Sequence, residues 1–300
     1  MINVIEYITE REGVKYALKA DKDMMKKNAW HLASVKGNEL PPVSTLGEAS
    51  HGVAGKSYNG LNVESREIEA GLYADGYDAA GVQRLLSEVP FLVSADDDAL
   101  GYLRLVNAAG VAFRIPAKCV SLTPEKYHRR SVKFGAVFDC PFPYFESDVL
   151  HSTPIFAVEG GKEYPIGEGL ERPYTFGSIK AGGSDQTVVC FNEGDAYAPC
   201  TIKLFGAGLE RVEITNQTTG AAVIVEGMNV GGIEICSDEN NLYAVFDDGT
   251  DATAYVSQFS NISDFKLKSG ANVINVKTTA SSVTAAGTLI EWRGRFSSCL

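Results

Sequence analysis

The clearest pattern of hydrophobic and polar positions along the chain is a strict alternation from Ser131 to Cys140. Alternation with a period of two, in β-branched and aromatic residues, predicts a long strand with one buried face. Pro141 and Pro143 follow directly. A proline lacks the N–H that a sheet ladder needs and restricts the residue before it, so the strand is predicted to end there. We interpret Pro141 and Pro143 as a short hinge between two domains.

The residues before this strand predict a mainly β domain with one packed helix. Asp78 can cap a helix over residues 78–89, where apolar residues recur at helical spacing before Pro90. Residues 21–60 are charged at first and then rich in Gly, Pro, Ser and Asn, which predicts a long loop. A change of phase near Ser65–Glu67 predicts a bulge within one strand over residues 61–73. Further strands are predicted at 2–8, 14–18, 91–94, 101–106, 111–115 and 118–122.

The residues after the prolines predict only short strands with turn residues between them. Turn signals such as Thr219-Gly220 and Asp247–Gly249 separate the strands, a pattern typical of a β-sandwich or jelly roll. The predicted fold class is therefore mainly β, with an N-terminal β-sandwich or split-barrel-like domain over residues 1–142 and a C-terminal β-sandwich over residues 143–300. The C-terminal strands are predicted at 187–192, 200–205, 212–216, 221–225, 232–236, 242–246, 253–257, 265–267, 272–277 and 288–296.

Composition narrows the classes of function. The 300 residues carry a formal net charge of −11, which argues against a surface built to bind nucleic-acid phosphates. No apolar run is long enough to span a bilayer, so no membrane insertion is expected. The six cysteines have no metal-binding spacing, and at least Cys140 and Cys190 lie in apolar strands. Buried free thiols are favoured over disulfides.

Three stretches of the chain resemble the distal tail (Dit) proteins of long-tailed, siphovirus-type bacteriophages. The first is the strand that runs into the prolines, Phe134–Tyr144. The second is Asn192–Asp195 with the following Ala198-Pro199 and Ile214–Gly220, and the third is Leu267–Ile274 with the closing strand. Their order and spacing cover most of the chain, whereas the first 60 residues match only weakly.

The resemblance implies a structural role. Dit proteins have an N-terminal β-domain with one flanking helix that forms a six-membered ring at the end of the tail tube, and a galectin-like C-terminal sandwich on the outside. The resemblance therefore implies a homo-hexamer at the virion tail tip, assembled in the host cytoplasm, with DNA only as passing cargo. The implied partners are the tail tube protein and tail-tip, fibre or receptor-binding proteins. Some members grip receptor-binding proteins with a long inserted arm, and no insertion of that size is evident between Tyr174 and Leu300.

The candidate site residues lie in two places. Gly52, Gly55 and Lys56 form part of a glycine-rich stretch that approaches a phosphate-binding loop but has Ser50 where the first glycine is needed. A plain loop and a loop that contacts a neighbouring ring subunit are the two interpretations left open. Tyr174, Tyr197 and Trp292 could form a platform for a glycan, although aromatic residues in a sandwich more often fill the core.

No catalytic, metal or cofactor site is expected. The four histidines are scattered, no nucleophile elbow is present, and the acidic clusters lack the spacing of a calcium loop. The resemblance implies a hub protein that joins the tail tube to the adsorption apparatus and surrounds the DNA exit channel, and the absence of catalytic motifs predicts that the protein is not an enzyme. The alternative is a carbohydrate- or receptor-binding adhesin that uses the C-terminal sandwich.

Overall fold

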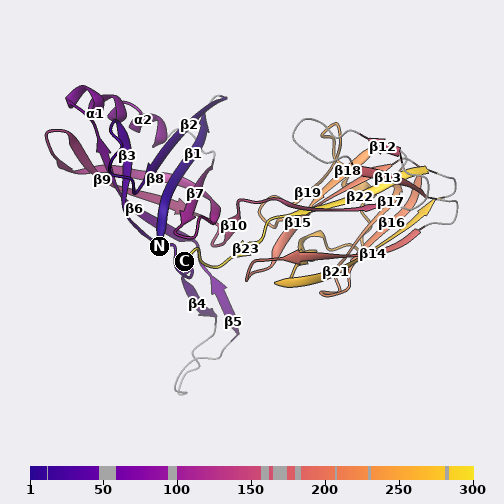
Figure 1. The fold of residues 1–300 in the computed structure, drawn as a ribbon. Helices are drawn as coiled ribbons and strands as arrows, with labels where there is room; N and C mark the ends of the chain where they lie inside the picture. The colour runs from indigo at the N-terminus through magenta and orange to yellow at the C-terminus, as the bar shows by residue number, and fades with distance from the viewer. Residues whose placement is uncertain are drawn as a thin grey trace, which may run out of the picture. The chain divides into compact units, whose positions relative to one another are not determined.

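The structure is a computed structural model that divides the chain into two compact units. One unit comprises Met1–Asp148 with Phe296–Leu300, and the other comprises Val149–Arg295 (Figure 1). None of the described helices has the length and apolar character needed to cross a membrane. The structure describes residues 1–11, 13–46, 59–93, 100–156, 162–164, 174–179, 184–206, 208–228, 231–280 and 284–300.

The first unit is built around a closed barrel of seven strands. The barrel runs in the order β8-β7-β1-β2-β3-β6-β9 and closes because β9 pairs back onto β8. Closure leaves no free edge within the barrel wall. The elements of this unit are β1 (Ile2–Arg11), β2 (Val14–Asp21), β3 (Ala29–Lys36), β4 (Val43–Leu46), β5 (Gly60–Val63), β6 (Arg66–Asp75), α1 (Ala79–Leu86), α2 (Val89–Leu92), β7 (Gly101–Asn107), β8 (Ala112–Tyr127), β9 (Ser131–Cys140) and β10 (Phe145–Ser147), with β23 (Arg295–Phe296) spanning the boundary.

Strand β9 confirms the alternation from which the fold was predicted. Val132, Phe134, Ala136 and Phe138 are buried in the barrel core, and the strand ends at Cys140. Its neighbour β6 pairs with it along its whole length. Burial of these apolar side chains is the main stabilising contribution to the barrel.

The helical part of this unit differs from the predicted helix 78–89. Asp78 does cap the helix, since its Oδ1 accepts the Gly81 N–H at 2.8 Å, but α1 ends at Leu86. Pro90 does not terminate that helix. It lies in the first turn of α2, where a missing N–H costs nothing. The strand predicted over residues 91–94 is therefore wrong, because α2 extends to Leu92.

The loop predicted over residues 21–60 is wrong where the structure describes it, because this range contains β3, β4 and the start of β5, and residues 47–58 lie outside the described residues. Strand β3 is a barrel strand with Trp30 and Leu32 buried, but a bulge between Leu32 and Ser34 breaks its alternation. The phase change near Ser65 is a break between β5 and β6, and not a bulge within one strand, since β5 pairs only with β4 among the described strands. The two strands predicted over 111–122 are one continuous strand, β8.

Pro141 and Pro143 lie inside the first unit and join β9 to β10. Strand β10 pairs with β8, and Phe145 at its start is fully buried, so the chain is still part of the first unit at this point. The division between the units falls between Asp148 and Val149, and not between residues 142 and 143. The chain also returns to the first unit at its C-terminal end, where Phe296 packs edge-on against Phe113 with ring centroids 5.1 Å apart. The hinge predicted at the two prolines is thus not where the chain passes between the units.

The second unit is a β-sandwich of an eight-stranded and a four-stranded sheet around its own core. The larger sheet is centred on β22 and β15, and the smaller runs in the order β14-β21-β16-β17. The segment predicted as a strand over 253–257 contains a 3-10 helix instead. The elements are β11 (His151–Phe156), β12 (Lys162–Tyr164), β13 (Tyr174–Ile179), β14 (Ser184–Asn192), β15 (Ala198–Gly206), β16 (Leu209–Asn216), β17 (Ala222–Met228), β18 (Gly232–Cys236), β19 (Tyr243–Phe246), η1 (Thr253–Tyr255), η2 (Ile262–Asp264), β20 (Lys266–Leu267), β21 (Gly270–Ala280) and β22 (Thr284–Trp292).

Candidate functional site

Strands β4 and β5 form a two-stranded ribbon that leads away from the barrel (Figure 1). The predicted contact residues Gly52, Gly55 and Lys56 lie outside the described residues, in the stretch of chain that joins β4 to β5. We call Val43–Leu46 and Gly60–Val63 together the β4–β5 ribbon. An isolated two-stranded hairpin is marginally stable in water, so the β4–β5 ribbon is expected to need a further surface to pack against.

One face of the β4–β5 ribbon carries most of its apolar side chains, and Leu46 is the apolar side chain of the opposite face. Val43 pairs with Val63 and Thr45 with Leu61, and side chains that are directly opposite each other, or two positions apart along a strand, point to the same side. Val43 is 52% exposed and Leu61 57% exposed, so the first unit itself does not cover this face. An uncovered apolar face favours association with another chain.

The root of the β4–β5 ribbon is held by Arg66, the first residue of β6. Its guanidinium donates to the carbonyl oxygens of Gly37 at 3.3 Å, Glu39 at 2.9 Å and Ser297 at 2.8 Å. It also lies 4.5 Å from the ring centroid of Phe145. Arg66 is only 3% exposed. One buried side chain thus ties the segment before β4 and the C-terminal residues to the barrel.

Burial lowers the pKa of the Arg66 guanidinium from its ordinary value, and a guanidinium remains protonated in proteins. The position had a signal in the sequence, because Arg66 is in phase with the buried Ile68, Ala70 and Leu72 along β6. A charged residue in phase with an apolar face indicates a buried, hydrogen-bonded charge. Its partners lie far away in the sequence and had no such signal.

The second and third stretches that carry the resemblance meet at three buried asparagines in the sandwich. Asn192 donates to the carbonyl of Leu267 at 3.1 Å, and Asn216 donates to that of Lys266 at 3.1 Å. Asn272 donates to the carbonyl of Lys268 at 2.7 Å and accepts its N–H at 2.9 Å. These side chains satisfy backbone groups at turns, so the motifs fix strand connections and do not form a reactive centre.

Gly194 in the same motif is required by a close approach. A Cβ atom at this position would lie 1.9 Å from the carbonyl oxygen of Arg295. Only glycine permits backbone to pass backbone so closely. The Asn192–Asp195 motif therefore has a packing reason within the sandwich.

Trp292 is not available to stack on a sugar. It is 5% exposed, its Nε1 donates to the carbonyl of Phe191 at 3.2 Å, and its ring stacks on His151 at a centroid distance of 5.6 Å. Tyr197 is exposed, and the side chain of Tyr174 lies outside the described residues. The glycan platform predicted from Tyr174, Tyr197 and Trp292 thus loses its largest ring, because Trp292 is part of the core.

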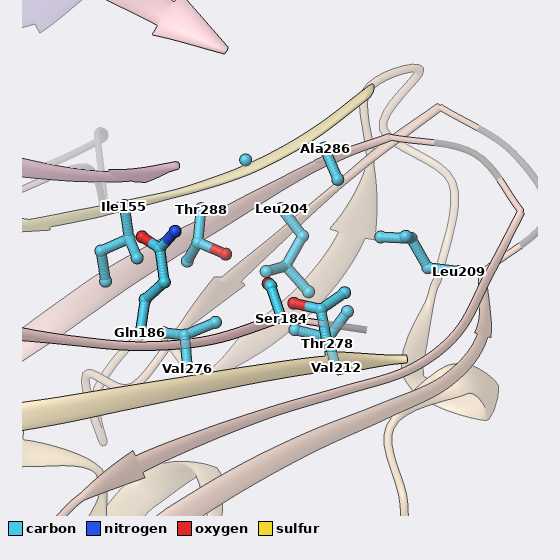
Figure 2. Close-up of a pocket in the computed structure, with 11 residues that line it drawn as sticks. Ile155, Ser184, Gln186, Leu204, Leu209, Val212, Val276, Thr278, Ala286 and Thr288 are labelled. Carbon is cyan, nitrogen blue, oxygen red and sulfur yellow. The ribbon is translucent and has the colours of Figure 1, made fainter. Parts of the chain in front are cut away.

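A small cavity lies between the two sheets of the sandwich (Figure 2). It offers about 10 Å³ to the centre of a water molecule, which is room for about one water and not for a sugar or a nucleotide. Figure 2 shows the Gln186 amide rising from β14 towards Ile155 and Thr288 of the opposite sheet. The cavity is lined by Ile155, Ser184, Gln186, Leu204, Leu209, Val212, Val276, Thr278, Ala286, Gly287 and Thr288.

The cysteines are buried and free, as predicted for Cys140 and Cys190. Burial raises the pKa of Cys119, Cys140 and Cys299 to about 12 and that of Cys190 to about 11. Thiols in this state are poor nucleophiles and poor metal ligands at neutral pH. Within the described ranges, no group of three or more His, Cys, Asp or Glu side chains could hold a metal ion.

Solved structures of other proteins have a fold similar to that of this chain. No protein-family model matches the chain, and no curated protein sequence matches it. The crystal structure of the Dit protein of phage SPP1, described as a paradigm of the hub adsorption apparatus in phages that infect Gram-positive bacteria, has a similar fold. It is 14% identical, with a TM-score of 0.59 over 99% of this chain and 99% of that chain.

A chain of the phage p2 baseplate, in its activated conformation with strontium, is similar over 97% of this chain and 98% of its own length. The identity is 12% and the TM-score 0.50. The chain therefore has a Dit-like fold, from the barrel through the sandwich and back to the first unit.

Proposed function

We propose that this chain is the hub protein of a bacteriophage tail tip. In this proposal it forms a six-membered ring that connects the tail tube to the host-adsorption apparatus and surrounds the DNA exit channel. The observation that carries the proposal is the Dit-like fold over 99% of both chains, since both units and their order are shared with the hub protein of phage SPP1. Fold alone does not fix function, so the proposal also needs support from surfaces of this chain.

The apolar face of the β4–β5 ribbon supports self-association. Val43 and Leu61 are more than half exposed, and covering them with a second copy would remove apolar surface from water. A contact between the ribbon of one copy and the barrel of the next joins two different surfaces. Such heterologous contacts build closed rings when the rotation between copies closes.

The negative charge of the chain supports a role around passing DNA. A formal charge of −11 on each copy repels phosphate and opposes adhesion of nucleic acid to the bore. We assign the protein to the virion tail, with the tail tube protein and the tail-tip, fibre or receptor-binding proteins as partners. The adhesin alternative is not carried further, because Trp292 is buried in the core.

The double variant Val43→Thr/Leu61→Thr tests the proposal. Threonine retains the preference for a strand and removes most of the apolar character, so the barrel is expected to fold while the ring dissociates. Native mass spectrometry of the full chain, alone and with its tail tube protein, should show a hexamer of the natural sequence in at least one of the two samples. The ring of the variant should be at least about tenfold weaker.

The matched control is Ser44→Thr/Asn62→Thr, which changes the opposite face of the same ribbon. The control should assemble like the natural chain. A natural chain that stays monomeric, both alone and with its tail tube protein, would contradict the ring. If the variant Val43→Thr/Leu61→Thr forms the ring as well as the natural chain does, the β4–β5 ribbon does not contribute to the contact between copies.

A further inference from the structure

The hairpin between β8 and β9 ends in a group of basic side chains. Lys126, His128, Arg129 and Arg130 are all exposed, and Tyr127 among them is 68% exposed. We call residues 126–130 the basic tip. Arginine and tyrosine are the residue types that most often dominate the energy of protein interfaces.

The basic tip is not neutralised within the described part of the chain, whereas other bases of the barrel are. Arg104 pairs with Asp148 at 2.9 Å, Arg114 with Glu146 at 3.0 Å and Lys133 with Glu125 at 2.5 Å. Lys126, Arg129 and Arg130 have no ion pair among the described residues. In a chain with 38 acidic and 27 basic residues, three bases without an ion pair within five described residues indicate a surface that meets a negative partner.

The basic tip is held in one geometry before any partner binds. The ladder between β8 and β9 continues to Tyr127 and Val132, and the His128 N–H donates to the carbonyl of Ser131 at 2.8 Å. The Gly76 N–H also donates to the carbonyl of Arg130 at 2.9 Å. A hairpin that is already ordered loses little conformational entropy on docking.

The opposite end of the same wall of the barrel is acidic. Strands β6 and β9 pair from Asp75 opposite Ser131, beside the basic tip, to Glu67 opposite Asp139 at the far end. Glu67 and Asp139 carry the same charge and lie directly opposite each other on neighbouring strands, and such a pair is destabilising. Around this far end lie five exposed carboxylates, of Glu39, Glu64, Glu67, Glu69 and Asp139, and we call them the acidic end.

Few bases neutralise the acidic end. Lys36 lies 3.5 Å from Glu69, and Lys118 is the cross-strand neighbour of Asp139, which leaves acids in excess. Glu67, Glu69 and Asp139 line an open hollow together with Lys36, Gly37, Pro42, Ser65 and Arg66, and the guanidinium of Arg66 is buried and bonded to backbone carbonyls. Ten residues of β9 separate the two ends by roughly 30 Å, so the basic tip cannot reach the acidic end of its own barrel.

We infer that the basic tip of one copy docks on the acidic end of a second copy. This inference rests on the proposed function, and it names the polar contact that accompanies the apolar contact of the β4–β5 ribbon. The ribbon leaves the barrel next to Glu39 and Glu64, so both contacts lie on one continuous surface of the receiving copy. The contact is heterologous, and salt weakens it because its charges are exposed.

A nucleic acid is the competing partner for a basic tip. The chain as a whole repels phosphate, and three or four bases give only a short electrostatic footprint. The acidic end of a second copy is opposite in charge to the basic tip and offers five carboxylates to its three or four bases. The test therefore also measures binding to nucleic acid.

A charge swap tests the inference. The tip variant Arg129→Glu/Arg130→Glu and the acidic-end variant Glu64→Lys/Glu67→Lys should each weaken self-association of the full chain by about tenfold or more, measured by sedimentation velocity at low salt. Mixed in equal amounts, the two variants should regain association, because each supplies the surface that the other has inverted. The control Lys15→Glu/Arg84→Glu makes the same change of net charge as the tip variant at exposed positions elsewhere, and it should associate like the natural chain.

Three outcomes would overturn the inference. The first is a mixture of the two variants that associates no better than either alone. The second is a tip variant that keeps self-association but loses binding to a single-stranded DNA oligonucleotide, which would assign the tip to nucleic acid. The third is a natural chain without any salt-sensitive association. A ring that depends on Val43 and Leu61 but not on the tip would leave the proposed function standing and remove only this inference.

Discussion

Arg66 shows how one buried charge can hold distant parts of a chain together. Its three carbonyl partners belong to residues 37, 39 and 297, so the contact to Ser297 spans 231 positions of sequence. A buried carbonyl that loses its donor costs free energy, and a buried guanidinium without acceptors costs more. The side chain therefore stabilises the first unit only while all of these segments are in place.

We predict that Arg66→Met destabilises the first unit. Methionine fills part of the volume but removes the hydrogen bonds from the buried guanidinium to the three carbonyls, so the free energy of unfolding should fall by about 2 to 4 kcal/mol. Chemical denaturation of the full chain measures this change. Arg84→Met, at an exposed position of α1, is the matched control and should change stability by no more than about 0.5 kcal/mol. Equal stability of the two variants would show that the Arg66 hydrogen bonds contribute nothing net.

The buried thiols predict a loss of stability at alkaline pH. Burial raises the pKa of Cys119, Cys140 and Cys299 from 9.0 to about 12. Below pH 9 these thiols are protonated in both the native and the unfolded chain. Between pH 9 and pH 12 the unfolded chain releases protons that the native chain retains, so the free energy of unfolding falls as the pH rises.

The variant Cys119→Ala isolates this effect. The free energy of unfolding of the natural chain should fall more steeply above pH 9 than that of the variant, by at most about 1.4 kcal/mol per pH unit. Denaturation series between pH 7 and pH 11 supply the comparison. Parallel curves for the two chains would mean that the thiol of Cys119 ionises in the native state as readily as in the unfolded state.

At the scale of elements, regular alternation was enough to predict a strand and irregular alternation was not. Strand β9 follows its pattern from Ser131 to Cys140, whereas β3 was missed because a bulge shifts its phase between Leu32 and Ser34. Val89–Leu92 is apolar without a period, and only the position of Pro90 in a first helical turn decides between strand and helix. Alternation within β4 and β5 was present in the sequence, but their pairing depends on register, which short strands do not specify.

The C-terminal segment is an element of the first unit, and its removal should destabilise that unit alone. Deletion of Ser297–Leu300 removes one acceptor of Arg66 and the fully buried Cys299, whose N–H donates to the carbonyl of Asn38 at 3.1 Å. Hydrogen exchange in β6 and β9 should accelerate, corresponding to about 2 to 4 kcal/mol. Exchange in β15 and β21 of the sandwich should not change.

Deletion of Leu300 alone is the control, because its side chain is largely exposed. It should leave exchange in both units as in the natural chain. If the longer deletion also leaves β6 and β9 protected, the C-terminal residues are docked on the first unit without stabilising it.

At the scale of the whole molecule, the sequence indicated two β-rich units in the right order but misplaced the point where the chain passes between them. The prolines after β9 marked the end of a strand correctly, yet β10 continues the same sheet and keeps the chain in the first unit. Nothing local to Phe296–Leu300 indicates that these residues return to the first unit, because their partners Asn38, Arg66 and Phe113 are far away in sequence. The bases of the basic tip are neighbours in the sequence, so this surface could be predicted from the sequence. The residues of the acidic end come from separate stretches of the chain that only strand pairing brings together.

The most direct test of the hub proposal is electron microscopy of the purified full chain, imaged alone and after mixing with its tail tube protein. The account predicts a six-fold annulus in at least one of the two samples, with the second units as outer densities. Particles of single-chain size in both samples would contradict it, and so would a closed assembly of any other symmetry.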